Sequence, residues 1–144
     1  MFAPMIHILK LCVGADSVED MTDWQTGQRH RWPAGQAVHV TRMRPRREAD
    51  VLEGGSLYWV IKGLILCRQR IVDLVAVTGD DGIARCAIHL DADVIRTEAA
   101  PRRPFQGWRY LDPRDTPRDL MVGRHREEPL PEVLALALAE MGVR

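Results

Sequence analysis

The residues best suited to chemistry are arginines, and two of them stand close together in a stretch typical of a β-sheet. In "GGSLYWVIKGLILCRQRIVDL", residues 54–74, Arg68 and Arg70 occupy positions where the alternation predicts apolar side chains. Residues two apart on a strand point the same way, about 6.5–7 Å apart. Two guanidiniums at that spacing can hold a phosphate, two neighbouring phosphates or two carboxylates. Because burying an unpaired charge is costly, the pair needs an anionic partner.

Further arginines precede this pair. The formal net charge is zero, so any affinity for an anion must come from local clustering. Seven basic residues against three acidic ones lie between positions 42 and 70, which favours a basic face. The arginines of "TRMRPRR" would frame the site: Arg42, Arg44, Arg46 and Arg47. The alternative is an ion-pair network within the chain, for which these carboxylates are candidates: Glu19, Asp20, Asp23, Glu48, Asp50 and Glu53.

A second basic cluster lies in "PRRPFQGWRY", residues 101–110. Arg102 and Arg103 stand near Trp108, and arginines beside aromatic rings suit phosphate contact and base stacking on single-stranded nucleic acid. The alternative is that Phe105 and Trp108 fill the open end of the sheet while the arginines stay solvated. The sequence leaves both interpretations open.

Motifs for catalysis or metal binding are absent from the sequence. The five histidines are scattered, the three cysteines lack zinc-ligand spacing, and there is no P-loop, GxGxxG or HExxH. We therefore expect no cofactor, no metal and no catalytic residue, and the prediction leans against an enzyme. The alternative is a small enzyme acting on an anionic metabolite, with His39 or His89 as proton carrier.

The elements that must position these residues form one domain over 1–144, of α+β class. We expect a bent, mostly antiparallel sheet of five or six strands, or a small barrel, with an N-terminal and a C-terminal helix. Strands are expected over 5–13, 37–44, 56–61, 64–77, 84–90 and 94–97. Asp16 or Ser17 would cap a helix over 17–26. Its Val18, Met21 and Trp24 fall on one stripe.

The last third of the chain changes in character. Four prolines between 101 and 117 predict an ordered crossing segment and connector over 99–129 rather than a regular element. "LPEVLALALAEMG" predicts a helix over 130–142 that is apolar nearly all round, and such a helix is either sandwiched or makes a homodimer contact. The start of the chain lacks a basic secretory n-region, and its apolar run is too short to span a bilayer. We expect a cytoplasmic protein without a membrane partner.

Several words of the sequence resemble a bacterial family of hypothetical proteins, domain of unknown function 1489. They are "HILKLCVGADSVEDM", "TRMRPRR", "GGSLYWVIKG", "CRQRI", "RCAIHLD" and "PRRPFQGWRYL", and the resemblance covers about residues 5–111. It implies a small intracellular protein and brings no activity. By element order alone, the chain is also similar to the PUA-like barrels, including the ASCH and EVE groups, which bind RNA or modified nucleotides.

The leading hypothesis from the sequence is a binding module for RNA or a nucleotide-like anion in an arginine-lined cleft. The enzyme described above is the second hypothesis. The third is a homodimeric interaction protein whose arginines are purely structural. The expected binding residues are Arg42, Arg44, Arg46, Arg47, Arg68, Arg70, Arg102, Arg103 and Trp108.

Overall fold

The computed structural model describes residues 5–120. Its elements in chain order are β1 (His7–Leu11), α1 (Val18–Gln28), η1 (Arg29–Arg31), β2 (Gln36–Thr41), α2 (Glu48–Leu52), β3 (Ser56–Ile61), β4 (Leu64–Thr78), β5 (Ala84–Asp91), β6 (Ile95–Pro101), β7 (Trp108–Leu111) and η2 (Pro113–Asp115). The α+β class is confirmed. The expected helix over 130–142 and its dimer contact lie outside the described residues.

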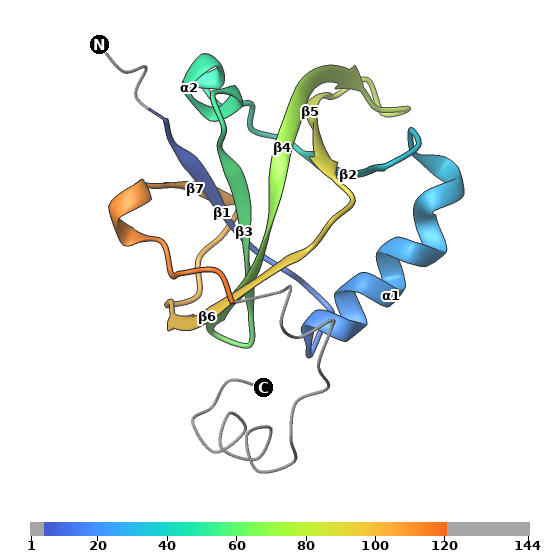
Figure 1. Cartoon of the computed structure of the whole chain (residues 1–144). Coiled ribbons are helices and arrows are strands. Elements are labelled where there is room, and N and C mark those ends of the chain that lie inside the picture. The colour runs from blue at the N-terminus through green and yellow to red at the C-terminus, as the bar shows by residue number, and fades with distance from the viewer. Residues whose placement is uncertain (1–4, 121–144) are drawn as a thin grey trace.

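One seven-stranded sheet organises the fold (Figure 1). Its order is β2-β5-β4-β3-β1-β7, and β6 pairs with β4 beside this path. The sheet is mixed, because β1 and β3 are parallel while the other pairs are antiparallel. Its end strands, β2 and β7, do not pair with each other in the described part of the chain. The sheet is therefore open, and the expectation of a closed barrel is wrong for this part.

The long strand β4 belongs to both halves of the sheet. Its first half pairs with β3 and β6, and its second half pairs with β5. The bend expected from its length is present as register shifts, which leave Leu66 and Val72 without a partner residue on the neighbouring strand. Figure 1 shows β4 running the height of the sheet and curving over toward β5.

These register shifts change which side chains share a face of β4. Leu66 and Leu74 join Cys67 and Ile71 in the main core, instead of sharing a face with the arginines. Arg68 instead stands opposite Tyr58 of β3. The apolar residues expected beside the arginines are therefore the wrong ones, because each extra residue reverses the alternation. Arg68 shares its face with Ile65 and Tyr58, which belong to a second, smaller core cluster.

Helix α1 closes the concave side of the sheet. It begins at the expected cap, where the Ser17 side chain accepts a hydrogen bond from the Asp20 backbone N–H at 3.1 Å. Its buried stripe consists of Val18, Met21 and Gln25. Trp24 was expected on this stripe but is 60% exposed, because the buried position one residue later is taken by Gln25.

The segment after residue 98 contains more regular structure than expected. β6 extends to Pro101, and β7 pairs antiparallel with β1. Both lie where proline-rich flanks are tolerated, since Pro101 ends its strand and β7 is an edge. Residue Asp119 then forms a bridge with Thr97 of β6, which ties the end of the described chain to the sheet.

The described residues contain neither a membrane-spanning helix nor a metal-binding cluster. No helix within 5–120 is long and apolar enough to cross a membrane. No group of three or more His, Cys, Asp or Glu side chains in that range is arranged to hold a metal ion.

Candidate functional site

Arg68 is held by partners within the chain. Its guanidinium donates to both carboxylate oxygens of Asp119, at 2.9 and 2.7 Å. A third donor, Nη1, bonds the Ser56 hydroxyl at 2.8 Å. The hydrogen bond from Arg68 keeps the pKa of Asp119 below its ordinary value. The bidentate pair fastens the chain after η2 onto β4, so Arg68 has a structural partner of the kind that the ion-pair alternative required.

Arg70 is exposed and makes no ion pair with a described residue. It shares with Arg68 a hollow of about 450 Å³. The hollow is lined by Arg68, Arg70, Asp91, Asp93, Val94, Ile95, Asp119 and Leu120. Three carboxylates against two guanidiniums give this hollow no surplus of positive charge, so it is poorly suited to a phosphate.

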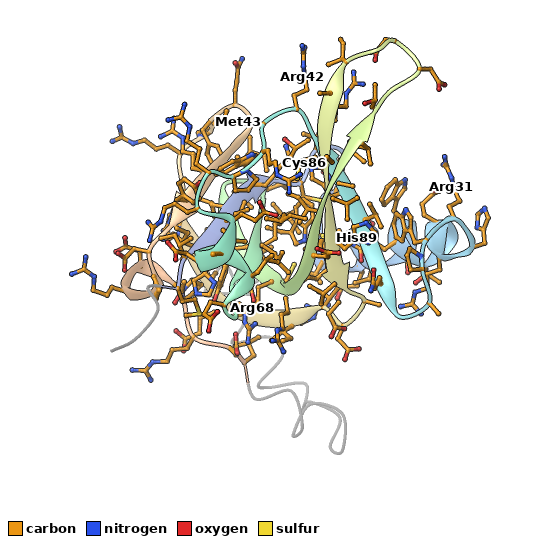
Figure 2. The ribbon with its side chains drawn as sticks, turned by 90° about the horizontal axis from the view of Figure 1, so that it is seen from above. Arg31, Arg42, Met43, Arg68, Cys86 and His89 are labelled. Atoms are coloured by element: carbon orange, nitrogen blue, oxygen red, sulfur yellow. The ribbon has the colours of Figure 1, made fainter. Side chains whose placement is uncertain are left out.

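The arginines of residues 42–47 lie elsewhere. Figure 2 shows Arg42 and Arg68 at opposite edges of the molecule. Arg44 pairs with Glu48 at 2.7 Å, and Arg47 pairs with Asp50 at 3.0 Å. Arg42 and Arg46 are exposed and make no ion pair with a described residue.

The second basic cluster does not offer a stacking surface through Trp108. This ring is only 6% exposed, and its Nε1 donates to the Met43 carbonyl at 2.7 Å. Arg102 donates to the Pro101 and Asp115 carbonyls, at 2.7 and 2.8 Å, while Arg103 is exposed. The nine residues expected at one cleft therefore do not share one site: Trp108 lies beside Met43, apart from Arg68. Three of the eight expected arginines pair with carboxylates of the chain: Arg44, Arg47 and Arg68.

A matched pair of substitutions measures the difference between Arg68, which is ion-paired, and Arg70, which is exposed. Arg68→Gln should lower the free energy of unfolding by about 1–2 kcal/mol, since it removes a bidentate, partly exposed ion pair. Arg70→Gln should change it by less than about 0.5 kcal/mol. Urea denaturation of both variants checks the expectation, and equal effects would contradict the structural role given to Arg68.

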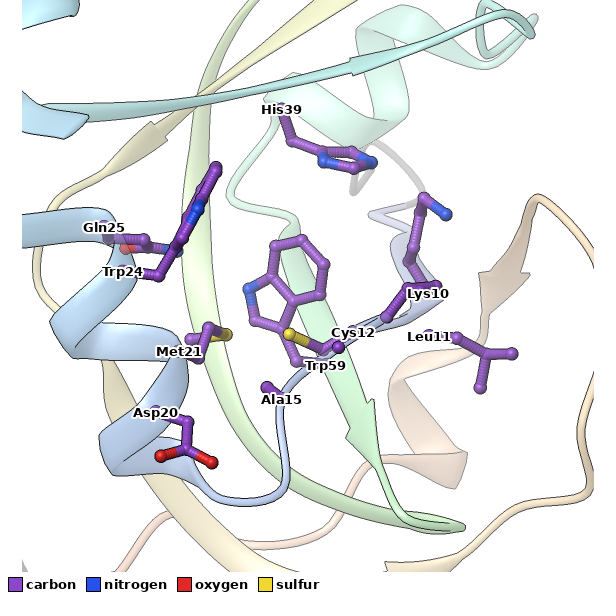
Figure 3. Close-up of a pocket in the computed structure, with 12 residues that line it drawn as sticks. Lys10, Leu11, Cys12, Ala15, Asp20, Met21, Trp24, Gln25, His39 and Trp59 are labelled. Carbon is purple, nitrogen blue, oxygen red and sulfur yellow. The ribbon is translucent and has the colours of Figure 1, made fainter. Parts of the chain in front are cut away.

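An aromatic pocket lies on the concave side of the sheet (Figure 3). Its volume is about 390 Å³, within the range of roughly 300–1,000 Å³ found for small-molecule sites. It is lined by Lys10, Leu11, Cys12, Val13, Gly14, Ala15, Asp20, Met21, Trp24, Gln25, His39 and Trp59. The lining strands β1 and β2 are separated by three others in the sheet order, so the curvature of the sheet creates the pocket.

The Trp59 ring is fixed by a buried amide network. Its Nε1 donates to Oε1 of Gln69 at 2.9 Å. Gln69 is fully buried; it exchanges two 2.9 Å hydrogen bonds with Gln25 of α1 and donates to the Asp91 carbonyl at 3.0 Å. Every polar group of the Gln69 side chain thus has a partner, and the network ties α1, β3 and β4 together at the rear of the pocket.

His39 contributes the unusual polar group of this pocket. Its ring meets Trp59 edge-on, with centroids 5.3 Å apart and planes at 86°. The Nε2 atom is buried and has no hydrogen-bond partner among the described residues. Burial, and secondarily the charge of Lys10, lower the pKa of His39 to about 4, so the ring is neutral at pH 7. A buried polar atom left unpaired costs about 1–3 kcal/mol, which makes Nε2 the candidate polar contact of this pocket.

The mouth of the pocket carries an exposed ring and a cation. Trp24 is 60% exposed although it borders the cavity. In Figure 3, Trp24 and Lys10 stand on opposite sides of the Trp59 ring, with His39 above it. The only carboxylate in the lining belongs to Asp20, which accepts a hydrogen bond from the Asp16 backbone N–H at 3.0 Å. The pocket therefore combines apolar ring faces with a few polar groups.

The two histidines considered as proton carriers lie on opposite faces of the sheet. His39 is paired with Ile88 and points to the core, whereas His89 is paired with Val38 and points outward. His89 Nδ1 lies 2.9 Å from the Gln36 side-chain oxygen. Cys12 borders the pocket, but burial raises the pKa of its thiol, so it is not an activated nucleophile.

Sequence reasoning missed the residues of the pocket for identifiable reasons. His39 and Trp59 were assigned to separate strands, and their contact depends on sheet curvature. One usable signal was Trp24, an aromatic residue in an otherwise polar helix whose buried stripe is complete without it.

Comparison with known proteins gives a family without an activity. A family model described as "Protein of unknown function (DUF1489)" matches residues 8–144. No curated protein and no solved structure matches the chain. The match covers most of the sequence and includes the motifs that carried the resemblance. The chain thus belongs to the family of proteins of unknown function DUF1489.

Proposed function

We propose that this protein is a binding module whose aromatic pocket takes a flat heteroaromatic ring of nucleobase type, carried by a nucleotide or RNA. The observation that carries the proposal is a pocket bordered by two tryptophans and by His39, whose buried Nε2 has no hydrogen-bond partner among residues 5–120. A nucleobase offers ring faces for the tryptophans and polar edge atoms for Nε2. The arginine-lined cleft expected from the sequence is replaced by this pocket as the proposed site.

Two features of the pocket, the unpaired Nε2 and the exposed Trp24 ring, are unfavourable in water. A nucleobase would provide a partner for both. The unpaired Nε2 gains a hydrogen bond to an edge nitrogen or oxygen of the ring, and either tautomer of a neutral imidazole can serve. The exposed face of Trp24 gains a stacking partner, which is worth about 1–3 kcal/mol per base. A purely aliphatic ligand could cover Trp24 but would leave Nε2 unpaired.

The charge of the pocket lining further narrows the class of ligand. Lys10 contributes a positive charge to the lining, and it is already one reason why His39 resists protonation. A cationic ligand would meet the same repulsion. A neutral ring that carries phosphate is compatible with Lys10, and it matches the nucleotide-like anion expected from the sequence.

Nucleotide titrations test this function. Binding of the four ribonucleosides and their 5′-monophosphates should be followed by tryptophan fluorescence and by amide chemical shifts. Trp24→Ala should weaken binding about 10- to 100-fold, as the loss of one stacking contact predicts. Its thermal stability should stay near that of the native chain, because the ring is 60% exposed.

The matched control is Met43→Ala. Met43 is an apolar side chain of similar exposure, 58%, outside the pocket. This variant should bind nucleotides as the native chain does. The proposal is refuted if no nucleoside or nucleotide binds at millimolar concentration, or if both variants lose affinity equally.

A further inference from the structure

A basic turn lies beside the mouth of the aromatic pocket. Arg29, His30 and Arg31 form η1 directly after α1, and all three are exposed. Trp32 follows, and its ring lies against Trp24 with centroids 5.9 Å apart and planes at 57°. Trp24 also lines the pocket, so a single side chain belongs to both the pocket and the aromatic pair beside the basic turn.

The cations of this turn are available to an outside anion. Arg31 donates to the neutral side chain of Gln28 at 3.1 Å, and neither arginine pairs with a carboxylate in the described part of the chain. Figure 2 shows Arg31 directed away from the body of the protein. Compensation of the negative end of the α1 dipole is the structural explanation for these residues, and the experiment below separates it from binding.

Charge along α1 gives a direction to any chain of phosphates that leaves the pocket. The first turn of the helix carries Glu19 and Asp20, whereas Arg29 and Arg31 follow its last residue. In the first turn Glu19 is paired with Arg96, so the acidic charge there is that of Asp20. A phosphate chain is therefore attracted to the basic turn rather than to the first turn. Arg29 and Arg31 lie between Trp24 and Trp32 in the sequence, and the two tryptophan rings contact each other. Trp24 is the exposed member of this pair, so it offers a ring face to a neighbouring base.

We infer that the ring in the pocket belongs to a single-stranded nucleic acid, whose adjoining phosphates contact Arg29 and Arg31. This inference rests on the proposed function and narrows its ligand from a nucleotide or RNA to a single-stranded polynucleotide. Aromatic stacking combined with cations along the backbone is the usual way in which proteins hold single strands. The interface would thus consist of the aromatic pocket, the Trp24–Trp32 pair and η1.

Salt dependence tests the inference. Single-stranded oligonucleotides of about six residues, as RNA and as DNA, should be compared with the nucleoside monophosphates between about 50 and 200 mM salt. We expect the oligonucleotide to bind at least about tenfold tighter, which corresponds to one further stacked base. The double variant Arg29→Gln/Arg31→Gln should reduce the slope of log K against log salt by about 1.4, at about 0.7 per lost phosphate contact. It should leave monophosphate binding unchanged.

The control removes the same charge elsewhere. Arg42→Gln/Arg46→Gln lowers the net charge equally, at two exposed positions away from the pocket, and should leave the slope unchanged. The inference is wrong if the oligonucleotide binds no tighter than the monophosphate, or if both double variants change the slope alike. Either result would still leave nucleotide binding in place, whereas failure of every ligand would remove the proposed function as well. Binding of the RNA alone, or of both the RNA and the DNA, supports the inference. Comparison of the two affinities shows whether the protein distinguishes ribose from deoxyribose.

Discussion

Replacing Gln69 with leucine should be among the most destabilising single changes in the described part of the chain. Gln69 accepts hydrogen bonds from Trp59 and Gln25, and it donates to Gln25 and to the Asp91 carbonyl. Leucine fits the space approximately but satisfies none of these groups. Each buried group left unpaired costs about 1–3 kcal/mol, and the burial of leucine offsets only part of this. We expect a loss of about 3 kcal/mol or more in the free energy of unfolding.

A double-mutant cycle shows whether the network acts as a unit. Gln25→Leu should also destabilise, and the double variant Gln25→Leu/Gln69→Leu should cost clearly less than the sum of the two single changes, because their shared bonds are lost once. Near-ultraviolet circular dichroism should report a loosened Trp59 ring in each Gln69 variant. Additive effects, or a Gln69→Leu variant as stable as the native chain, would contradict this role.

The sequence predicted elements well where the signals are local. The strand over 56–61 was predicted with the bounds that the structure shows, because aromatic and β-branched residues precede a two-residue turn. In that turn Lys62 and Gly63 both have positive φ, at 51° and 81°, as a tight hairpin requires. Ser17 caps the helix for an equally local reason, since the cap and the backbone N–H that donates to it lie three residues apart.

Features that depend on distant contacts could not be predicted in the same way. One extra residue at Leu66 and another at Val72 reverse the alternation of β4, and nothing in the local sequence marks either position. The partner of Arg68 is Asp119, 51 residues later, which was not among the carboxylates considered. β7 was missed because its four residues are flanked by prolines and pair only with β1.

In the candidate site, too, local features could be predicted from the sequence and features that depend on distant contacts could not. Trp59 lies in a strand that the sequence predicts and is only 5% exposed, yet it also borders a cavity. A lone histidine on a strand usually has a satisfied or solvated ring, and His39 departs from that rule only because the sheet curls over it. Whether a buried atom has a partner is a property of the assembled fold and is not encoded in the spacing of residues.

His39→Phe should produce a protein that is more stable and binds less. Phenylalanine preserves the edge-on contact with Trp59 while removing the unpaired Nε2. We expect the free energy of unfolding at pH 7 to rise by about 1–2 kcal/mol. Affinity for the nucleotides should fall by about tenfold or more, since one hydrogen bond in a dry pocket is lost. A histidine kept only for packing would show the first effect without the second.

Acid pH sharpens this test. The pKa of His39 is about 4 in the fold, below its ordinary value of 6.5, so the unfolded chain binds the proton more readily between these values. The free energy of unfolding is therefore unaffected by His39 protonation above about pH 6.5. It falls by up to about 3 kcal/mol as the pH is lowered toward 4, because the unfolded chain takes up the proton first. His39→Phe should remove this part of the pH dependence, so its advantage over the native chain should grow from pH 7 to pH 4.

Val40→Phe is the matched control for this substitution. It introduces the same side chain one residue further along β2, on the outward face, where Val40 is 48% exposed. Because it leaves the pocket unchanged, we expect native nucleotide affinity and a native dependence of stability on pH. If Val40→Phe and His39→Phe weaken binding alike, the effect belongs to β2 as a whole, and Nε2 is not the group that recognises the ring. If only His39→Phe does so while gaining stability, the unpaired nitrogen is a cost that the fold retains for its ligand.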